Sequence, residues 1–156
     1  MIYLDLENKI INDLENAMIC SFATANKKGE VSARNMTIVN IGLKIYLQTD
    51  NSFDKIKDIK ENPNVAINFG AYSFKGKAKV VGHPSVNKTY IEKIKLKHEY
   101  TYKHYTNLAN EVLIEIIPSS AKIWGIDFEK KIANQETITE VDFNNKTFKI
   151  IVCDKM

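Results

Sequence analysis

Residues 42–69 have the sequence GLKIYLQTDNSFDKIKDIKENPNVAINF, and the spacing of apolar residues changes twice within it. The first third alternates apolar and polar side chains, which predicts a strand. The middle third has apolar residues at helical spacing, with Ser52 as the expected N-cap. The pair Asn62-Pro63 should end this helix, because proline disfavours helical geometry in the residue before it. The last third returns to a strand pattern.

The same reading extends to both sides of this stretch. It predicts a helix over residues 4–16, a helical stretch over 85–96, an irregular aromatic segment over 100–105, and strands over 18–25, 31–39, 43–47, 65–69, 74–81, 111–117, 121–126 and 147–152. From residue 128 to 146 the chain looks polar and is not expected to form a strand. Many short strands with helices between them indicate an α+β protein built round one antiparallel barrel.

The bulk composition sets limits on the class of protein. A chain of 156 residues is expected to form a single domain over residues 1–156. A net charge of +3, spread along the chain, gives little reason to expect a nucleic-acid partner. Cys20 and Cys153 lie far apart and are expected to be inert thiols.

The chain is expected in the cytoplasm and not in a membrane. Asp5 and Glu7 interrupt the apolar run that a secretory signal would need near the start. No run of about eighteen apolar residues is present, so no bilayer-spanning helix is expected.

Arg34 is the only arginine, and every other basic residue apart from histidine is a lysine. A guanidinium presents a planar fork that holds a phosphate through two parallel hydrogen bonds, which an ammonium cannot reproduce. Arg34 is therefore a candidate phosphate ligand. An exposed charge on an edge strand is the equally open alternative.

Lys55 lies in the first turn of the predicted helix that follows Ser52. Helix N-termini favour anions and disfavour cations. A phosphate bound between Ser52, Lys55 and the first backbone N–H groups would account for the lysine. The alternative is a capped helix whose lysine points to solvent, partly balanced by Asp54.

Taken together, these segments resemble the signature of the pyridoxamine 5'-phosphate oxidase-like split barrels. The matching pieces are Arg34-Asn35-Met36, Gly42 to Thr49, Ser52, Lys55, Asn62 to Phe69 and Phe74-Lys75-Gly76-Lys77-Ala78, with a weaker match at Lys122-Ile123-Trp124. The resemblance covers roughly residues 5–126. It implies an antiparallel split β-barrel of six or more strands in Greek-key order, with flanking helices.

The resemblance also implies a cofactor, flavin mononucleotide (FMN), and a homodimer with the flavins at the interface. Arg34 and Lys55 would bind the flavin phosphate, with hydroxyls from Ser52 and Thr49. Asn35 and Met36 would lie along the isoalloxazine edge, and Thr37 and Gln48 complete the motif's cofactor set. Trp124 would contact the ring or the interface from the second subunit, unless it is a core residue of its own strand.

Two departures from the family pattern limit the activity, and one of them is Ala71, about where the oxidases have a glutamine. The segment 125–131 contains no arginine or histidine of the kind with which the true oxidases grip the vitamin's phosphate, so pyridoxamine phosphate oxidation is not expected. The expectation is an FMN-dependent oxidoreductase that acts on a small acceptor, with a reduced nicotinamide cofactor as one possible reductant. Residues 127–156 form a C-terminal extension of unknown role, and no catalytic residue or substrate can be assigned.

Two other classes of function stay open. A split barrel that binds haem or senses flavin without turnover could use His83 as a ligand. A nucleic-acid-binding barrel could use the lysines and tyrosines of residues 88–105. No metal site is expected, because His98 and His104 are six residues apart and lack clustered acids or cysteines.

Overall fold

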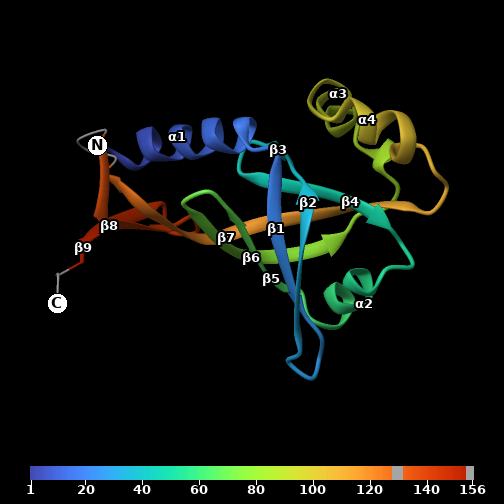
Figure 1. Cartoon of the computed structure of the whole chain (residues 1–156), viewed down its shortest axis with the longest axis horizontal. Helices are drawn as coiled ribbons and strands as arrows, with labels where there is room; N and C mark the ends of the chain where they lie inside the picture. The colour runs from blue at the N-terminus through green and yellow to red at the C-terminus, as the bar shows by residue number, and fades with distance from the viewer. Residues whose placement is uncertain (128–131, 154–156) are drawn as a thin grey trace.

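The protein is a curled antiparallel sheet with helices at its margins (Figure 1). The computed structural model describes the backbone of residues 1–127 and 132–153, and the side chains of residues 1–125 and 137–153. The elements are α1 (Tyr3–Asn16), β1 (Ile19–Ala25), β2 (Val31–Thr37), β3 (Val39–Ile41), β4 (Lys44–Asp50), α2 (Asp54–Glu61), β5 (Asn64–Phe69), β6 (Tyr72–Val80), the short η1 (Pro84–Val86), α3 (Lys88–Lys97), α4 (Glu99–Thr101), the π-helix η2 (Tyr102–Thr106), β7 (Glu111–Asp127), β8 (Ile132–Asp142) and β9 (Thr147–Val152).

The sheet has the strand order β2-β1-β5-β6-β7-β4-β3, and β8 and β9 continue it from the far part of β7. Every pairing is antiparallel. The sheet curls so far that β2 and β4, which are not hydrogen-bonded neighbours, touch each other. The predicted α+β fold with an antiparallel split barrel is confirmed.

Two groups of buried side chains hold these elements together. The main core lies inside the curled sheet, and α1 contributes Leu6, Ile10 and Leu14, all fully buried. Burying one such side chain stabilises the fold by roughly 1.5–3 kcal/mol. A smaller cluster lies under α3, where Tyr90 and Ile94 pack on β3, β4 and β7. The main core therefore fixes α1 to the sheet, and the smaller cluster fixes α3 near the side where β4 ends (Figure 1).

The start of α2 differs from the prediction. The N-cap position is Phe53, which makes no side-chain cap, so the assignment of Ser52 as N-cap is wrong. Asp50 is the reason, because its Oδ1 accepts hydrogen bonds from both the backbone N–H and the hydroxyl of Ser52, at 2.8 and 2.6 Å. The predicted end of the helix is confirmed: α2 stops at Glu61, just before Asn62-Pro63.

The strand predicted as two pieces, 111–117 and 121–126, is one long strand, β7. Its ladder with β6 shifts register between Lys75 and Gly76, which lets Pro118 lie opposite Gly76 without a break. A Cβ on Gly76 would come within 2.5 Å of the carbonyl oxygen of Ile117, so only glycine fits this crossing.

Two further expectations about the chain are wrong. The segment predicted as irregular, residues 100–105, is helical and forms the end of α4 and the π-helix η2. The polar stretch after residue 128 contains strand β8, which pairs with both β7 and β9. The expectation that the chain does not oxidise pyridoxamine phosphate depended on residues 125–131, and residues 128–131 of that segment lie outside the described residues. No helix among the described residues is long and apolar enough to cross a bilayer.

Candidate anion site at Arg34 and Lys55

Arg34 lies in β2, opposite Phe22 of β1. Its Nη1 donates to Thr24 Oγ1 at 2.8 Å and, at 3.4 Å each, to the carbonyl oxygens of Phe22 and Ser32. The guanidinium carbon lies 5.9 Å from the centre of the Phe22 ring. These contacts hold the guanidinium flat against β1 and leave it half-buried.

Lys55 lies in the first turn of α2, and its Nζ donates to Thr49 Oγ1 at 3.1 Å. The same nitrogen lies 4.6 Å from the centre of the Phe53 ring. Burial, followed by the positive charge of Arg34, lowers the pKa of Lys55 below its ordinary value of 10.5. The ammonium group is therefore partly removed from water and is repelled by the positive charge of Arg34.

A hydrogen-bond chain links the strand that carries Arg34 to the helix that carries Lys55. Thr24 Oγ1 accepts from Arg34 and donates to Asp58 Oδ2 at 2.9 Å. Asp58 follows Lys55 by three residues on α2, so both side chains lie on the same face of the helix. The sequence analysis missed Thr24 and Asp58. The only sequence signal for Thr24 was its inward position in the alternating strand β1.

In the part of the chain that the structure describes, no carboxylate lies within ion-pair distance of either cation. Among the described residues, Arg34 and Lys55 take part in no ion pair, and every hydrogen bond of Arg34 uses Nη1, leaving Nε and Nη2. Lys55 uses one of its three donors. A planar fork beside an ammonium, without a carboxylate, is a donor set that suits a phosphate monoester. The residues present therefore fit a phosphate group.

The remaining motif residues on β2 and in the β4–α2 turn lie around this pair. Asn35 is exposed on the other face of β2. Met36 is half-buried and packs against the main core, and Thr37 is half-buried at the end of the strand. Ser52 is exposed and is held within its own turn. The structure brings Arg34, Thr49 and Lys55 together, with these four at its edge.

Gln48 lies in a different environment from its neighbour Thr49. Its Nε2 donates to Glu111 Oε2 at 2.5 Å, and its Oε1 accepts from Tyr90 Oη at 2.7 Å and from Thr106 Oγ1 at 3.0 Å. All four residues are buried. Burial raises the pKa of Glu111, while the hydrogen bond from Gln48 opposes that shift. Gln48 joins β4 to β7, α3 and η2.

Trp124 lies at the opposite end of β7 from the residues next to Lys55. It pairs with Ile138 of β8, whereas the opposite end of β7 pairs Glu111 with Asp50, next to α2. Thirteen residues of extended strand span up to roughly 40 Å. Trp124 is 50% exposed, so it is not the core residue of the alternative interpretation.

Histidine and cysteine form no metal centre in the described part of the chain. Both ring nitrogens of His83 are engaged, Nδ1 with Ser85 Oγ at 2.8 Å and Nε2 with the carbonyl oxygen of Leu108 at 3.0 Å. His98 is buried, with Nε2 donating to the carbonyl oxygen of Ile38 at 2.9 Å. Burial raises the pKa of Cys20 to about 12, which keeps this free thiol unreactive.

The aromatic segment 88–105 does not present a continuous stacking surface. Tyr90 is buried and Tyr102 is half-buried, while Tyr100 and Tyr105 are exposed, with Tyr100 4.2 Å from the ring of His104. Half of the tyrosines considered for nucleic-acid stacking are therefore turned toward the protein.

Comparison with known proteins places this site in a family. The family model described as pyridoxamine 5'-phosphate oxidase matches residues 6–125. The chain belongs to the pyridoxamine 5'-phosphate oxidase family. The matched residues include β2, β4 and α2, which carry the pair Arg34 and Lys55, whereas β8 and β9 lie beyond the match.

Relatives of this family fit the chain along most of its length. General stress protein 26 of Bacillus subtilis is 32% identical over 128 residues, which are 76% of this chain and 88% of that protein. A pyridoxamine 5'-phosphate oxidase-related, FMN-binding protein from Nostoc punctiforme has a TM-score of 0.62 at 10% identity, over 97% of this chain and 95% of that one. HutZ, the haem storage protein from Vibrio cholerae, has a TM-score of 0.57 at 12% identity, over 76% of this chain and 91% of that one. At these identities, the two structures show a shared fold.

Proposed function

We propose that the chain binds flavin mononucleotide and acts as a flavin-dependent oxidoreductase on a small acceptor in the cytoplasm. The observation that carries the proposal is the pair of neighbouring cations, Arg34 and Lys55, with no carboxylate partner among the described residues. The family and the FMN-binding protein from Nostoc punctiforme support flavin as the source of the phosphate. Bound flavin would supply the electron and hydride transfer.

The chain's own residues would bind and orient the cofactor. Arg34 would donate through Nε and Nη2, and Lys55 through the two protons that Thr49 does not engage. The phosphate would neutralise the two like charges and would oppose the lowering of the Lys55 pKa, which the charges of Glu111, Asp50 and Asp54 already oppose in part. Asn35, Met36 and Thr37 follow Arg34 along β2, where the flavin ring would lie.

A homodimer belongs to the same proposal. Trp124 lies at the opposite end of β7 from the residues next to Lys55, so a second copy would supply it to a flavin whose phosphate Lys55 holds. Strand β2 is an edge strand with exposed Val31, Ala33 and Asn35 on one face. A partner molecule packed along this edge strand would lie beside the cofactor that Arg34 holds from the opposite face. A reduced nicotinamide is one candidate reductant. The proposal assigns no residue to binding the reductant or the acceptor.

The test compares FMN with riboflavin, which lacks the phosphate. FMN should bind the wild-type chain with a dissociation constant of about 1 µM. Riboflavin should bind about 100-fold more weakly or worse, because it lacks the group that makes the two charge-assisted contacts. Lys55→Met should weaken FMN binding by about tenfold or more and leave riboflavin binding unchanged. Quenching of flavin fluorescence measures all four affinities.

Lys57→Met is the matched control, because Lys57 lies on the same helix and is exposed. It should leave both affinities unchanged. Equal affinities of the wild-type chain for FMN and riboflavin would refute the phosphate site, and absence of FMN binding would refute the cofactor.

Haem is the second candidate ligand, because HutZ shares the fold and is described as a haem storage protein. His83, the residue considered as its ligand, has both ring nitrogens in hydrogen bonds. Haem binding through His83 would have to break the contact with Ser85 or with Leu108. A haem titration followed by its Soret band, repeated with His83→Ala, tests this candidate separately from the flavin experiment.

A further inference from the structure

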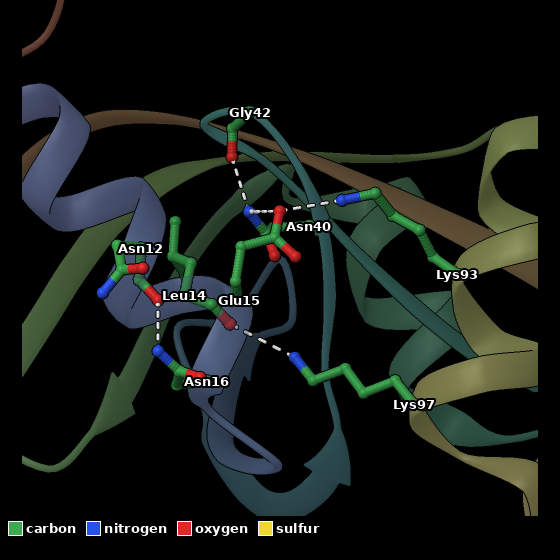
Figure 2. Close-up of polar contacts among 8 residues, drawn as sticks. All are labelled: Asn12, Leu14, Glu15, Asn16, Asn40, Gly42, Lys93 and Lys97. Carbon is green, nitrogen blue, oxygen red and sulfur yellow. Dashed lines mark hydrogen bonds and ion pairs between the residues drawn. The ribbon is translucent and has the colours of Figure 1, made fainter.

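A hollow lies away from Arg34 and Lys55, where the C-terminal end of α1 meets β3 and α3 (Figure 2). It has a volume of about 310 Å³ and is lined by Glu15, Val39, Asn40, Lys93, Leu96 and Lys97. Small-molecule sites in proteins begin at about this size, roughly 300 Å³. Figure 2 shows that the polar lining comes from all three elements: Asn40 and Lys93 meet at Glu15, and Lys97 reaches the carbonyl oxygen of Leu14.

Asn40 is the most informative residue of this hollow, because it is 1% exposed and yet incompletely bonded. Its Nδ2 donates to the carbonyl oxygen of Gly42 at 2.9 Å and to Glu15 Oε1 at 3.2 Å. Its Oδ1 has no partner among the described residues. Exchanging the amide oxygen and nitrogen would not help, because the oxygen would then face two acceptors. The site therefore contains a buried acceptor that lacks a donor, which costs about 1–3 kcal/mol if left unpaired.

Lys97 adds a charge that the protein does not neutralise directly. Its Nζ donates to the carbonyl oxygen of Leu14 at 3.2 Å, and it forms no ion pair among the described residues. Burial lowers the pKa of Lys97, since its ammonium is partly removed from water. Lys93, by contrast, is paired with Glu15 Oε1 at 2.8 Å. Two ammonium groups and one carboxylate leave one positive charge at the hollow.

A purely structural role explains only part of this arrangement. The pair Lys93 and Glu15 ties α3 to α1, and Lys97 caps the carbonyl end of α1. Neither role provides a donor for Asn40 Oδ1 or a counter-charge for Lys97. Both would be supplied by a ligand with one negative charge and one hydrogen-bond donor close to it.

We propose that this hollow binds a small monocarboxylate that carries a hydroxyl or amino group next to its carboxylate. The carboxylate accepts from Lys97, and a small movement of the side chains that enclose Asn40 Oδ1 admits the adjacent hydroxyl or amino group, which donates to that oxygen. A single carboxylate matches the single excess positive charge better than a phosphate dianion does. Val39 and Leu96 provide apolar surface for a short side chain of the ligand. This site does not depend on the flavin proposal.

The test titrates the full-length protein with L-lactate and with propionate, which has the same carbon skeleton without the hydroxyl. The Asn40 side-chain amide signals, observed by ¹H–¹⁵N NMR, report binding at the proposed position. Lactate should shift them saturably, with a dissociation constant of about 1 mM for a ligand of its size. Propionate should bind at least about tenfold more weakly, because it leaves Oδ1 unpaired.

Two variants complete the experiment. Lys97→Met keeps the length of the side chain, removes its charge, and should weaken lactate binding by about tenfold or more. Lys95→Met is the control, because Lys95 lies over the ring of Tyr102 and does not line the hollow. Unchanged lactate binding in Lys97→Met, or equal binding of lactate and propionate, would overturn the proposal. The proposal would also be overturned if the amide signals did not move at lactate concentrations up to about 50 mM. An ordered water would then be the donor to Asn40 Oδ1.

Discussion

Gln48 and Thr49 are neighbours on β4, but their side chains face opposite sides of the strand and serve different purposes. Around Gln48 the polar groups are buried and bonded to one another, with the amide engaged by Glu111, Tyr90 and Thr106. Around Thr49 the ammonium of Lys55 has one neutral acceptor and forms no ion pair among the described residues, although the charges of Glu111, Asp50 and Asp54 favour its charged form from a distance. A polar cluster bonded to itself stabilises the fold, whereas an ammonium with free donors is available to a ligand.

The largest expected effect is on stability, from the Gln48 side. Gln48→Leu would leave the Glu111 carboxylate without its donor and the hydroxyls of Tyr90 and Thr106 without their shared acceptor. The free energy of unfolding should fall by about 3 kcal/mol or more, because each buried group left unpaired costs about 1–3 kcal/mol. Urea unfolding measures the loss. A loss below about 1 kcal/mol would show that this cluster does not hold α3 and η2 to the sheet.

The next effect is on ligand affinity, from the Thr49 side. Thr49→Val keeps the shape of the side chain and removes the acceptor that positions Lys55 Nζ. FMN binding should weaken by about fivefold to tenfold, equivalent to roughly 1 kcal/mol, while the free energy of unfolding changes by less than that. The same fluorescence titration and urea unfolding check both numbers. The opposite result, a large loss of stability with unchanged affinity, would erase the distinction between the two faces of β4.

The smallest effect is a pH dependence on the helical side, where His98 anchors the end of α3 to Ile38. Burial lowers the pKa of His98 from its ordinary value of 6.5, although the hydrogen bond to Ile38 partly opposes this. The folded state therefore binds the proton less readily than the unfolded state. The resulting stability is present above pH 6.5 and is lost as the pH falls through the folded-state pKa.

His98→Gln keeps a donor for Ile38 and removes the titrating ring. The free energy of unfolding of this variant should change less than that of the wild-type chain between about pH 7.5 and pH 5. Parallel slopes for the two proteins would mean that the His98 proton is not linked to folding.

Helices α1, α2 and α3 and the first strands could be predicted from the sequence because their patterns are local, whereas the helical residues 100–105 were not predicted. The apolar spacing of α1, the β1–β2 hairpin around Gly29, and the end of α2 at Asn62-Pro63 each depend on residues within one or two turns of chain. Strand β8 could not be predicted in this way. Two of its inward-facing side chains, Thr137 and Thr139, are polar although they are fully or almost fully buried. The strand therefore lacks the alternation of apolar and polar residues that would have identified it in the sequence.

The candidate site was predictable in its charged groups and not in their partners. Arg34 was conspicuous as the single arginine, and Lys55 as a cation where a helix begins. The contact between Thr24 and Asp58 joins residues 34 positions apart, and that between Gln48 and Glu111 joins residues 63 positions apart. No spacing rule connects such residues, because the connection is made by strand register.

By itself, the sequence determined the alternation of strands and helices, the family motif and the two cations, since each is expressed by neighbouring residues or by composition. Only the tertiary structure decided that Thr49 would face Lys55 while Gln48 faces a buried acid, and that Asn40 would be buried with an unpaired oxygen. The physical reason is that a hydrogen bond depends on distance and direction between groups that the curl of the sheet brings together. Those distances are set by the packing of the whole chain.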